Sequence, residues 1–418
     1  MRERNDQDWL AEPDGQAVSS AGVRFSHNGH DHAHGLAHGA TCACGFCDGE
    51  GHDHGHGSHV EAATAGELAA ADSSSTLPSY DWDQAAEQIG REDRVFGAPT
   101  GGVSFGSHLG RGATVTYGFL GEDDVSADAD GRDYQALSAA ESAAIETALA
   151  RIASVADIAF VRVTGADGVH LDDPADAQID FEGIAGTNGG LARTAYAGQA
   201  LLRSTVAIGE RGLEDEGSYA FRTALHEIGH AIGLSHPSDY GGAGAQSYAE
   251  SAEFREDTAQ FTVMSYWDET ASDADYGRDY STHLMLYDIA ALQRLYGANE
   301  NARTGDDVYG AGAADAAWSL DGGLIGAIWD AGGHDRLDGS GVAADQRIDL
   351  REEAFSSLGG LTHNVAIARG AVIEDATGGA GDDALVGNDV ANTLIGGGGA
   401  DLIQGGAGAD LIFGDDFV

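Results

Sequence analysis

Residues 226–236 read HEIGHAIGLSH, and the spacing within this stretch determines how the rest of the chain is interpreted. In an α-helix, side chains four residues apart lie one above the other on the same face. His226 and His230 can therefore direct their imidazole rings at one cation. Glu227 lies beside them and can reach a water held by that cation without being a ligand itself.

Two further residues of the pattern lie where this helix must end. Gly233 can take the left-handed conformation that stops a helix and reverses the chain. His236 then approaches from another direction and completes a set of three imidazoles, which leaves positions open for water and substrate. HExxH alone is a weak signal in a chain with 17 histidines. The added Gly and His at the expected positions make it a poor alternative that the three histidines are unrelated and bind no metal. The stretch therefore predicts a catalytic zinc site.

The charge balance excludes one class of partner. The 69 Asp and Glu residues outnumber the 21 Lys and Arg residues, which gives a formal net charge of −48. Binding to a phosphate backbone needs clustered basic residues, so nucleic acid is not an expected partner. The surplus of carboxylates fits either a highly soluble surface or the binding of divalent cations.

The sequence contains no apolar segment long enough to cross a bilayer, so no transmembrane segment is expected. Its start, MRERNDQDWLAEPDG, lacks the apolar stretch of a secretory signal peptide. If the protein is exported, we therefore expect a route that does not depend on a signal peptide.

Residues 1–78 differ in composition from the remainder of the chain. They hold nine of the 17 histidines and all three cysteines, Cys42, Cys44 and Cys47. Low hydrophobicity and a high Gly content argue against a packed core, so we expect a disordered N-terminal extension or propeptide. Imidazole and thiolate bind borderline metals, but their irregular spacing here matches no zinc-finger pattern. Incidental metal affinity and a dedicated metal store both stay open.

Residues 79–303 alternate helix and strand signals, which predicts a domain built on one mixed sheet with helices. Ser138 and Glu141 form a capping box before a helix that places Ile145 and Ile152 on one face. The other expected elements are helices over 81–91, around His226 and over 282–297, and strands over 114–120, 158–163, 178–183 and 204–210.

Residues 304–418 carry a nine-residue period, in which GGAGDDALV (378–386) is followed by three further copies up to residue 413. Such a period predicts an all-β parallel β-roll, in which six residues turn the chain and three form a short strand. The carboxylate at position six joins backbone oxygens around a structural calcium ion. The expected calcium ligands are Asp383, Asp401 and Asp410, together with Asp335 in the half-turn GGHDRLDGS (332–340).

The repeats are not uniform. Asn392 replaces the position-six carboxylate in the second copy, so we expect a weaker calcium site there. Leu385 and Leu394 stand at position eight, whereas Leu402 stands at position seven, which predicts an imperfect register. A flexible tail rich in Gly and Asp is the alternative to a roll.

Several motifs together resemble the serralysins, which are calcium-dependent secreted bacterial proteases of the metzincin type. They are HEIGHAIGLSHP, the turn Val263-Met264-Ser265-Tyr266, MLYDIAALQRLYGAN and the Asp-rich nonapeptides, and the resemblance covers residues 80 to 413. It implies an α+β architecture, in which a metzincin-type catalytic domain of mixed sheet plus helices precedes an all-β RTX β-roll. It also implies one catalytic zinc ion and several structural calcium ions. In that family the tyrosine two residues after the turn methionine is a zinc ligand in the resting enzyme, and the methionine forms an apolar floor beneath the zinc. Those residues are Tyr266 and Met264 in this chain.

The activity that this resemblance implies is zinc-dependent endoproteolysis of extracellular proteins or peptides. Glu227 would take a proton from the zinc-activated water as it attacks the scissile carbonyl, and would then pass it to the leaving amine. Zinc and the hydroxyl of Tyr266, swung aside as a donor, would stabilise the developing oxyanion. We expect the substrate to lie along the strand at 204–210 by β-augmentation.

The resemblance also implies a secreted, extracellular monomer that a type I secretion ABC transporter exports independently of a signal peptide. It suggests a proteinaceous inhibitor as a further partner. The end of the sequence, GDDFV (414–418), resembles the family's C-terminal export signal, although the β structure that usually precedes it is missing or shortened. The N-terminal extension is longer than a propeptide of the family needs to be. One hypothesis is that a His or Cys from it occupies the zinc and keeps the precursor silent.

Two other functions fit parts of the sequence. A non-catalytic, calcium-dependent surface or matrix protein could keep a decayed protease domain. A decayed site would tolerate the loss of Glu227 and His236, and both are present. The other alternative is a metal-buffering protein centred on the His-rich N-terminal segment. The sequence does not indicate which peptide bonds would be cut.

Overall fold

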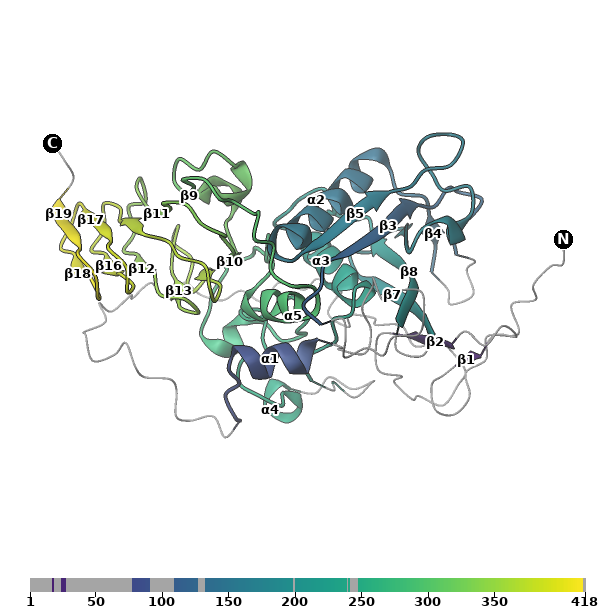
Figure 1. Cartoon of the computed structure of the whole chain (residues 1–418), viewed down its shortest axis with the longest axis horizontal. Helices are drawn as coiled ribbons and strands as arrows, with labels where there is room; N and C mark the ends of the chain where they lie inside the picture. The colour runs from purple at the N-terminus through teal and green to yellow at the C-terminus, as the bar shows by residue number, and fades with distance from the viewer. Residues whose placement is uncertain are drawn as a thin grey trace.

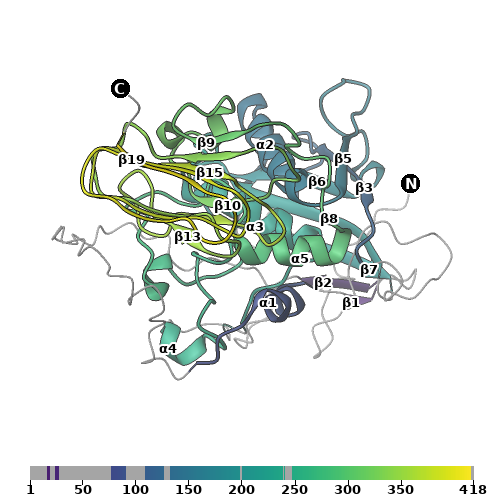
Figure 2. The same cartoon turned by 60° about the vertical axis from the view of Figure 1, so that its left-hand side comes forward.

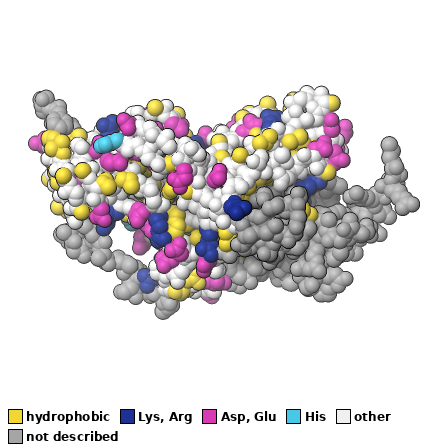
Figure 3. Space-filling view, in the orientation of Figure 1, with side chains coloured by type: hydrophobic (Ala, Val, Ile, Leu, Met, Phe, Trp, Pro, Cys, Tyr) yellow, Lys and Arg dark blue, Asp and Glu magenta, His cyan; other side chains and the backbone are white. Residues whose placement is uncertain are grey.

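The computed structural model describes residues 17–18, 24–27, 77–90, 109–126, 132–197, 200–238, 240 and 247–415. The three cysteines, most of the His-rich stretch and the last three residues of the expected export signal lie outside the described residues. The described part forms two lobes, one of helices packed on a sheet and one of stacked short strands (Figure 1). Acidic side chains occur over both lobes in the space-filling view (Figure 3), as the net charge requires.

The larger lobe is built on a mixed sheet with the strand order β1-β2-β7-β8-β6-β3-β5, and β4 pairs with β6 beside this path. Strands β8, β6, β3 and β5 run parallel, whereas β7 is antiparallel to β8. The bounds are β1 Ala17–Val18, β2 Arg24–His27, β3 Ala113–Phe119, β4 Tyr134–Gln135, β5 Ile158–Arg162, β6 Ile179–Ile184, β7 Gly190–Ala197 and β8 Ala200–Gly209.

The four strands predicted from the sequence are confirmed as β3, β5, β6 and β8. The sequence did not predict β7. The expectation that the strand at 204–210 forms the substrate-binding edge is wrong, because this segment belongs to β8, which is hydrogen-bonded to β6 on one side and to β7 on the other. A strand with both backbone edges paired has no free groups to bind a peptide.

Helices cover the sheet and carry the site. Their bounds are α1 Trp82–Ile89, α2 Ala139–Val155, α3 Tyr219–Ala231, α4 Tyr248–Ser251 and α5 Leu286–Tyr296, with short 3-10 helices at η3 Pro174–Asp176, η4 Glu269–Ser272, η5 Ala316–Trp318 and η6 Leu320–Gly322. The predicted capping box of α2 is confirmed, since Ser138 Oγ accepts the N–H of Glu141 and Glu141 Oε2 accepts the N–H of Ser138. Ile145 and Ile152 on the same helix are fully buried. Helix α3 packs against β7 and β8.

The smaller lobe is a roll of short parallel strands, whose coils overlap when the molecule is turned (Figure 2). One sheet has the order β19-β17-β15-β11-β9 and the facing one has the order β12-β16-β18. A third small sheet, β10-β14-β13, lies beside α5. The bounds are β9 Val308–Gly310, β10 Gly326–Ile328, β11 Arg336–Asp338, β12 Arg347–Asp349, β13 Phe355–Ser356, β14 Val365–Ile367, β15 Asp375–Thr377, β16 Ala384–Val386, β17 Thr393–Gly397, β18 Leu402–Gln404 and β19 Leu411–Asp415.

The register of the roll is regular, contrary to expectation. Leu385 pairs with Ile403, and Leu394 pairs with Ile412, so position eight stacks on position eight in alternate repeats. Leu385 and Leu394 are fully buried, whereas Leu402 at position seven is 49% exposed. Isoleucine at position eight preserves the apolar stack, and the leucine at position seven belongs to the outer face. The flexible-tail alternative is therefore excluded for this part of the chain.

Candidate metal centre

Helix α3 positions the first two histidines of the predicted zinc site. Its N-cap, Ser218, accepts the backbone N–H of Phe221 at 3.1 Å, which satisfies one of the free donors at the helix start. From Ala220 to Ala231 every side chain except Arg222 is buried. The helix is therefore packed on nearly all sides. Burying a polar side chain on it costs free energy unless that side chain has a hydrogen-bond partner or binds a ligand.

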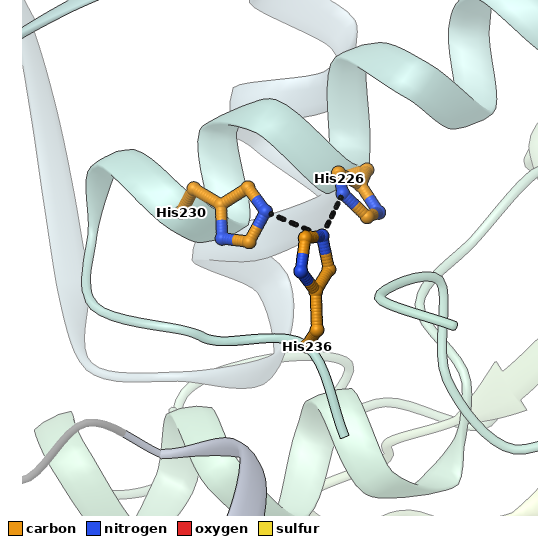
Figure 4. Close-up of side chains that lie close together, drawn as sticks. All are labelled: His226, His230 and His236. Atoms are coloured by element: carbon orange, nitrogen blue, oxygen red, sulfur yellow. Dashed lines mark hydrogen bonds between the residues drawn. The ribbon is translucent and has the colours of Figure 1, made fainter. Parts of the chain in front are cut away.

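The helix ends where the sequence predicted. Gly233 has a φ of +118°, in the left-handed region that a side chain would disfavour. The N–H of Leu234 then bonds the carbonyl of Gly229 at 2.8 Å, and the chain turns back beneath the helix. This reversal brings His236 up to the two helical histidines from below in the close-up view (Figure 4).

The three imidazoles converge on one point. Nε2 of His236 lies 3.2 Å from Nε2 of His226 and 3.1 Å from Nε2 of His230. A tetrahedral zinc ion with Zn–N bonds of about 2.0–2.1 Å separates its nitrogen ligands by roughly 3.3 Å. The spacing of the donor atoms therefore fits a zinc ion.

Backbone carbonyls fix the orientation of the two helical rings. Nδ1 of His226 donates to the carbonyl of Val263 at 2.8 Å, and Nδ1 of His230 donates to the carbonyl of Leu234 at 2.9 Å. A proton on Nδ1 leaves the lone pair on Nε2, where a metal would bind. Burial lowers the pKa of His226 to about 4, so this ring is neutral at physiological pH.

Glu227 is a fully buried carboxylate next to this cluster. Neither of its oxygens makes a hydrogen bond of standard geometry to the residues that the structure describes. Burial raises the pKa of Glu227 to about 8, and the nearby backbone N–H of Ala192 and the charge of Arg132 oppose this rise only in part. A buried carboxyl group of this kind is suited to accept and release a proton near neutral pH.

Met264 packs against the helix that carries His226 and His230. It is fully buried, and a Cβ added to Gly229 of α3 would lie 2.9 Å from its sulfur. The glycine inside HEIGH therefore allows the methionine side chain to pack directly against the helix that carries His226 and His230. The close contact explains why this helix position needs a residue without a side chain.

Tyr266 borders the cluster of imidazoles. Its ring centroid lies 4.5 Å from that of His236 and 5.9 Å from that of His226. Burial raises the pKa of the Tyr266 phenol above its ordinary value. The Tyr266 ring therefore borders two of the three histidines, His236 and His226.

Sequence reasoning missed a residue that supports this geometry from a distance. Asp288 on α5 accepts the N–H groups of Val263 and Met285, each at 2.9 Å, and the hydroxyl of Thr262 at 2.6 Å. It is completely buried. A signal was present, since an acidic residue inside the apolar run LYDIAAL (286–292) has to find polar partners when it is buried.

A second group of polar side chains lies where the roll begins. Carboxylate oxygens of Asp307, Asp330 and Asp335 lie within 4.8 Å of one another. Oδ2 of Asp335 is buried and has no hydrogen-bond partner among the described residues. The sequence predicted Asp335 as a calcium ligand, but it did not identify the other two carboxylates.

The remaining predicted calcium ligands line the turns of the roll. Asp383 is buried and accepts the N–H groups of Gly379 and Gln346 at 2.5 and 2.7 Å. Asp401 accepts the N–H of Asp383 at 3.0 Å, and Asp410 accepts the N–H of Asn392 at 3.1 Å. The carboxylates of Asp401 and Asp410 therefore each face position six of the repeat two before their own.

The comparisons with known proteins match both lobes. Residues 124–261 match the family model described as Matrixin, and residues 298–414 match the one described as Peptidase M10 serralysin C terminal. In the part of the chain that the structure describes, no helix is long and apolar enough to span a membrane.

Curated relatives align over both regions. The chain is 37% identical over 345 residues to "Serralysin" of Proteus mirabilis, and this alignment covers 77% of the chain and 67% of the relative. It is 38% identical over 328 residues to "Serralysin C" of Dickeya chrysanthemi, with 74% and 64% covered. It is 36% identical over 338 residues to "Metallopeptidase AprA" of Pseudomonas marginalis, with 75% and 67% covered. The chain therefore spans about two thirds of the length of these relatives.

Proposed function

Because this chain belongs to the serralysin family of secreted zinc metalloendopeptidases, we propose that it cleaves internal peptide bonds of extracellular proteins at the centre formed by α3 and the following loop. His226, His230 and His236 would hold the zinc, and Glu227 would act as the general base. One observation carries the proposal: three Nε2 atoms converge with spacings that fit a zinc ion, beside a buried carboxylate whose oxygens make no hydrogen bond of standard geometry to the described residues.

The zinc ion supplies an acidified water and a polarised substrate carbonyl. Glu227 would take one proton from the attacking water and deliver it to the leaving amine. Burial raises the pKa of Glu227 above its ordinary value in the metal-free site, which favours holding the proton between the two steps. The hydroxyl of Tyr266, beside His236, would donate a hydrogen bond to the developing oxyanion.

The substrate would bind along β7 instead of β8. β7 begins at Gly190, and a Cβ at this position would lie 2.8 Å from Cγ of Glu227, so the strand starts beside the general base. β7 is the last strand of the sheet before the N-terminal strands β2 and β1. If β2 were displaced, an extended peptide could pair with this edge of β7 and pass the zinc site.

The N-terminal segment would regulate access to this edge. The backbone of β2, Arg24–His27, pairs antiparallel with residues 193–196 of β7. A substrate that adds to β7 would need the same backbone groups, so we propose that removal of the segment opens the edge. The separate hypothesis that a His or Cys of the extension binds the zinc concerns residues that, apart from His27, lie outside the described ones.

Structural calcium is part of the proposal. Three carboxylates, those of Asp307, Asp330 and Asp335, lie close together, and one buried oxygen of Asp335 has no hydrogen-bond partner in the part of the chain that the structure describes. Like charges at this distance are relieved either by a proton or by a bound cation, and oxygen ligands of this kind suit calcium. Asp383, Asp401 and Asp410 would serve further calcium ions in the roll. Export by a type I transporter, independence of a signal peptide, a proteinaceous inhibitor and a monomeric state stay predictions from the family resemblance.

Replacing Glu227 with Gln tests the function. Glu227→Gln should lower kcat on a fluorogenic peptide by about 10²–10⁴-fold, because only proton transfer is lost. Zinc content should stay at the wild-type value. Glu87→Gln is the matched control, since Glu87 is exposed and pairs with Arg294 on the surface. Two results would contradict the proposal: full activity in Glu227→Gln, or peptide cleavage by the wild type that is insensitive to chelators. A wild-type protein without activity would favour the non-catalytic alternative.

A further inference from the structure

A carboxylate outside the zinc site, that of Asp257, accepts hydrogen bonds from three hydroxyl groups. Oδ2 of Asp257 accepts Ser238 Oγ at 2.5 Å, and Oδ1 accepts Tyr240 Oη at 2.6 Å and Ser265 Oγ at 2.7 Å. Asp257 is fully buried. Hydrogen bonds to an ionised or partly ionised acceptor are stronger than neutral ones, and several on one group restrain all the donors together.

The three donors come from the two segments that border the metal centre. Ser238 and Tyr240 follow His236 in the loop after α3, and Ser265 immediately precedes Tyr266 in the turn. The buried carboxylate therefore fastens the loop of the third histidine to the turn that carries the catalytic tyrosine. Neither segment can shift without breaking one of these bonds.

Tyr240 also contacts Tyr266 directly. Their rings are stacked, with centroids 4.7 Å apart and 22° between the planes. The ring of Trp267 meets Tyr240 edge-on at 5.6 Å and 89°. His236 meets the Tyr266 ring at 4.5 Å and 61°. Tyr266 is thus bordered by a tethered aromatic ring and by a histidine of the metal centre.

We propose that Tyr240, tethered by Asp257, is a positioning residue that guides Tyr266 between a metal-bound and a withdrawn position. The inference rests on the proposed function, in which Tyr266 donates to the oxyanion, and on the family resemblance, which implies that Tyr266 binds the zinc in the resting enzyme. The Tyr266 ring can slide parallel to the stacked Tyr240 ring, but it cannot move toward that ring without a steric clash. The fixed face of Tyr240 therefore confines the movement of Tyr266 to one plane.

Two variants of Tyr240 separate the effects of its ring and its hydroxyl. Tyr240→Phe keeps the stacked ring and loses the tether to Asp257, whereas Tyr240→Leu loses the ring. The matched control is Tyr248→Phe, because the Tyr248 hydroxyl also makes one hydrogen bond, to the carbonyl of Arg255 at 2.6 Å, while its ring contacts Trp267. All variants would be measured as full chains.

Two readouts are needed besides zinc content. The first is kcat and KM on a fluorogenic peptide. The second is the visible absorption of the protein loaded with Cu(II), which imidazole sites also bind, because a phenolate bound to Cu(II) absorbs by charge transfer. Tyr266→Phe identifies the part of this band that depends on Tyr266.

We expect graded effects on kcat with little change in KM. Small errors of placement are costly in catalysis, so Tyr240→Phe should lower kcat about tenfold and Tyr240→Leu about a hundredfold. The Tyr266-dependent band should weaken or shift in the same order. Tyr248→Phe should keep both the wild-type kcat and the wild-type band.

The outcomes distinguish failure of the inference from failure of the function. An unchanged band and kcat in Tyr240→Leu, with the wild-type band lost in Tyr266→Phe, would overturn the role of Tyr240 alone. Equal losses in Tyr240→Phe and Tyr248→Phe would also overturn it, because they would indicate a general loss of packing. A wild-type protein without a Tyr266-dependent band would overturn the metal-binding role of Tyr266 and the inference with it, while leaving Glu227 and the histidines in place.

Discussion

The carboxylate of Asp288 accepts the backbone N–H of Val263 at 2.9 Å, and the carbonyl of the same Val263 accepts the Nδ1 hydrogen of His226 at 2.8 Å. One residue of the turn thus connects an acid on α5 with a histidine on α3. By fixing the peptide groups of the turn, the acid also fixes the ring orientation that leaves Nε2 of His226 free for the metal. Such indirect partners of a metal ligand affect affinity although they never touch the ion.

Replacing Asp288 with Asn should therefore weaken zinc binding about tenfold to a hundredfold. The amide keeps one acceptor oxygen, but its NH₂ group would face N–H or O–H donors that now give hydrogen bonds to the carboxylate. The free energy of unfolding should therefore also fall by about 1–3 kcal/mol. Competition with a fluorescent zinc chelator measures the affinity. Asp268→Asn is the control, because Asp268 is exposed and only caps the short helix η4. Unchanged zinc affinity in Asp288→Asn would show that the turn orients His226 without this acid.

Gly190 at the start of β7 limits the space behind the general base. An added Cβ would lie 2.8 Å from Cγ of Glu227 and 2.8 Å from Cγ2 of Thr223. Gly190→Ala should displace the carboxylate and lower kcat about tenfold to a hundredfold while zinc content stays unchanged. Gly189→Ala is the matched control, since a Cβ there would meet nothing closer than Thr187 Oγ1 at 3.7 Å. Equal activity of the two variants would show that Glu227 tolerates the added methyl group.

The sequence could predict the parts of this site that depend on local spacing. His226, His230 and Gly233 lie on one helix and its end, so the helical repeat is enough to bring the two rings together and to place the reversal. The capping box of α2 depends only on residues three apart, and it is present. The period of the roll is local in the same sense, and it predicted parallel strands.

Features that depend on distant segments could not be predicted in this way. The sequence around Asp257 gives no local sign of burial, and the apolar run around Asp288 does not identify its partners, which come together only when the turn, the loop and α5 meet. β7 was missed because its residues 190–197, GLARTAYA, include glycine and short alanines that give little strand signal. Without β7 the order of strands was unknown, and β8 was therefore taken for the edge.

The cluster around Asp335 predicts how calcium and pH act together. Burial, with added repulsion from Asp330, Glu374 and Asp307, raises the pKa of Asp335 from 3.8 to about 7 in the calcium-free protein. An acid whose pKa is higher in the folded than in the unfolded protein favours folding when protonated. The stability of the calcium-free protein should therefore fall as the pH rises from about 4 to 7.

Calcium should reverse this trend, because it binds the deprotonated carboxylates and neutralises their repulsion. We expect the increase in melting temperature caused by calcium to be larger at pH 8 than at pH 5. Thermal unfolding with calcium and with a chelator at both values measures this difference. Asp335→Asn should reduce the calcium effect, and the same calcium effect at both pH values in the wild type would contradict the assignment.

The second repeat of the roll should depend less on calcium than its neighbours. Nδ2 of Asn392 donates to the carbonyl of Glu374 at 2.7 Å and to Oδ1 of Asn388 at 2.9 Å, so an amide already binds oxygens that a cation could otherwise hold. Asn392→Asp would replace these donors by a carboxylate facing two oxygens. Without calcium, it should lower the free energy of unfolding by about 2–4 kcal/mol, because two bonds are lost and a mostly buried charge is left unpaired.

Added calcium should restore part of this loss in Asn392→Asp, since the new carboxylate matches the position-six residues of the other repeats. Calcium titrations of unfolding in wild type and variant measure the recovery. Asn301→Asp, which adds one negative charge at an exposed position, is the control for net charge. If the calcium-free stability of Asn392→Asp equals that of the wild type, the hydrogen bonds of the amide do not stabilise this turn. The regular register at Leu394 would then depend on the apolar stack alone.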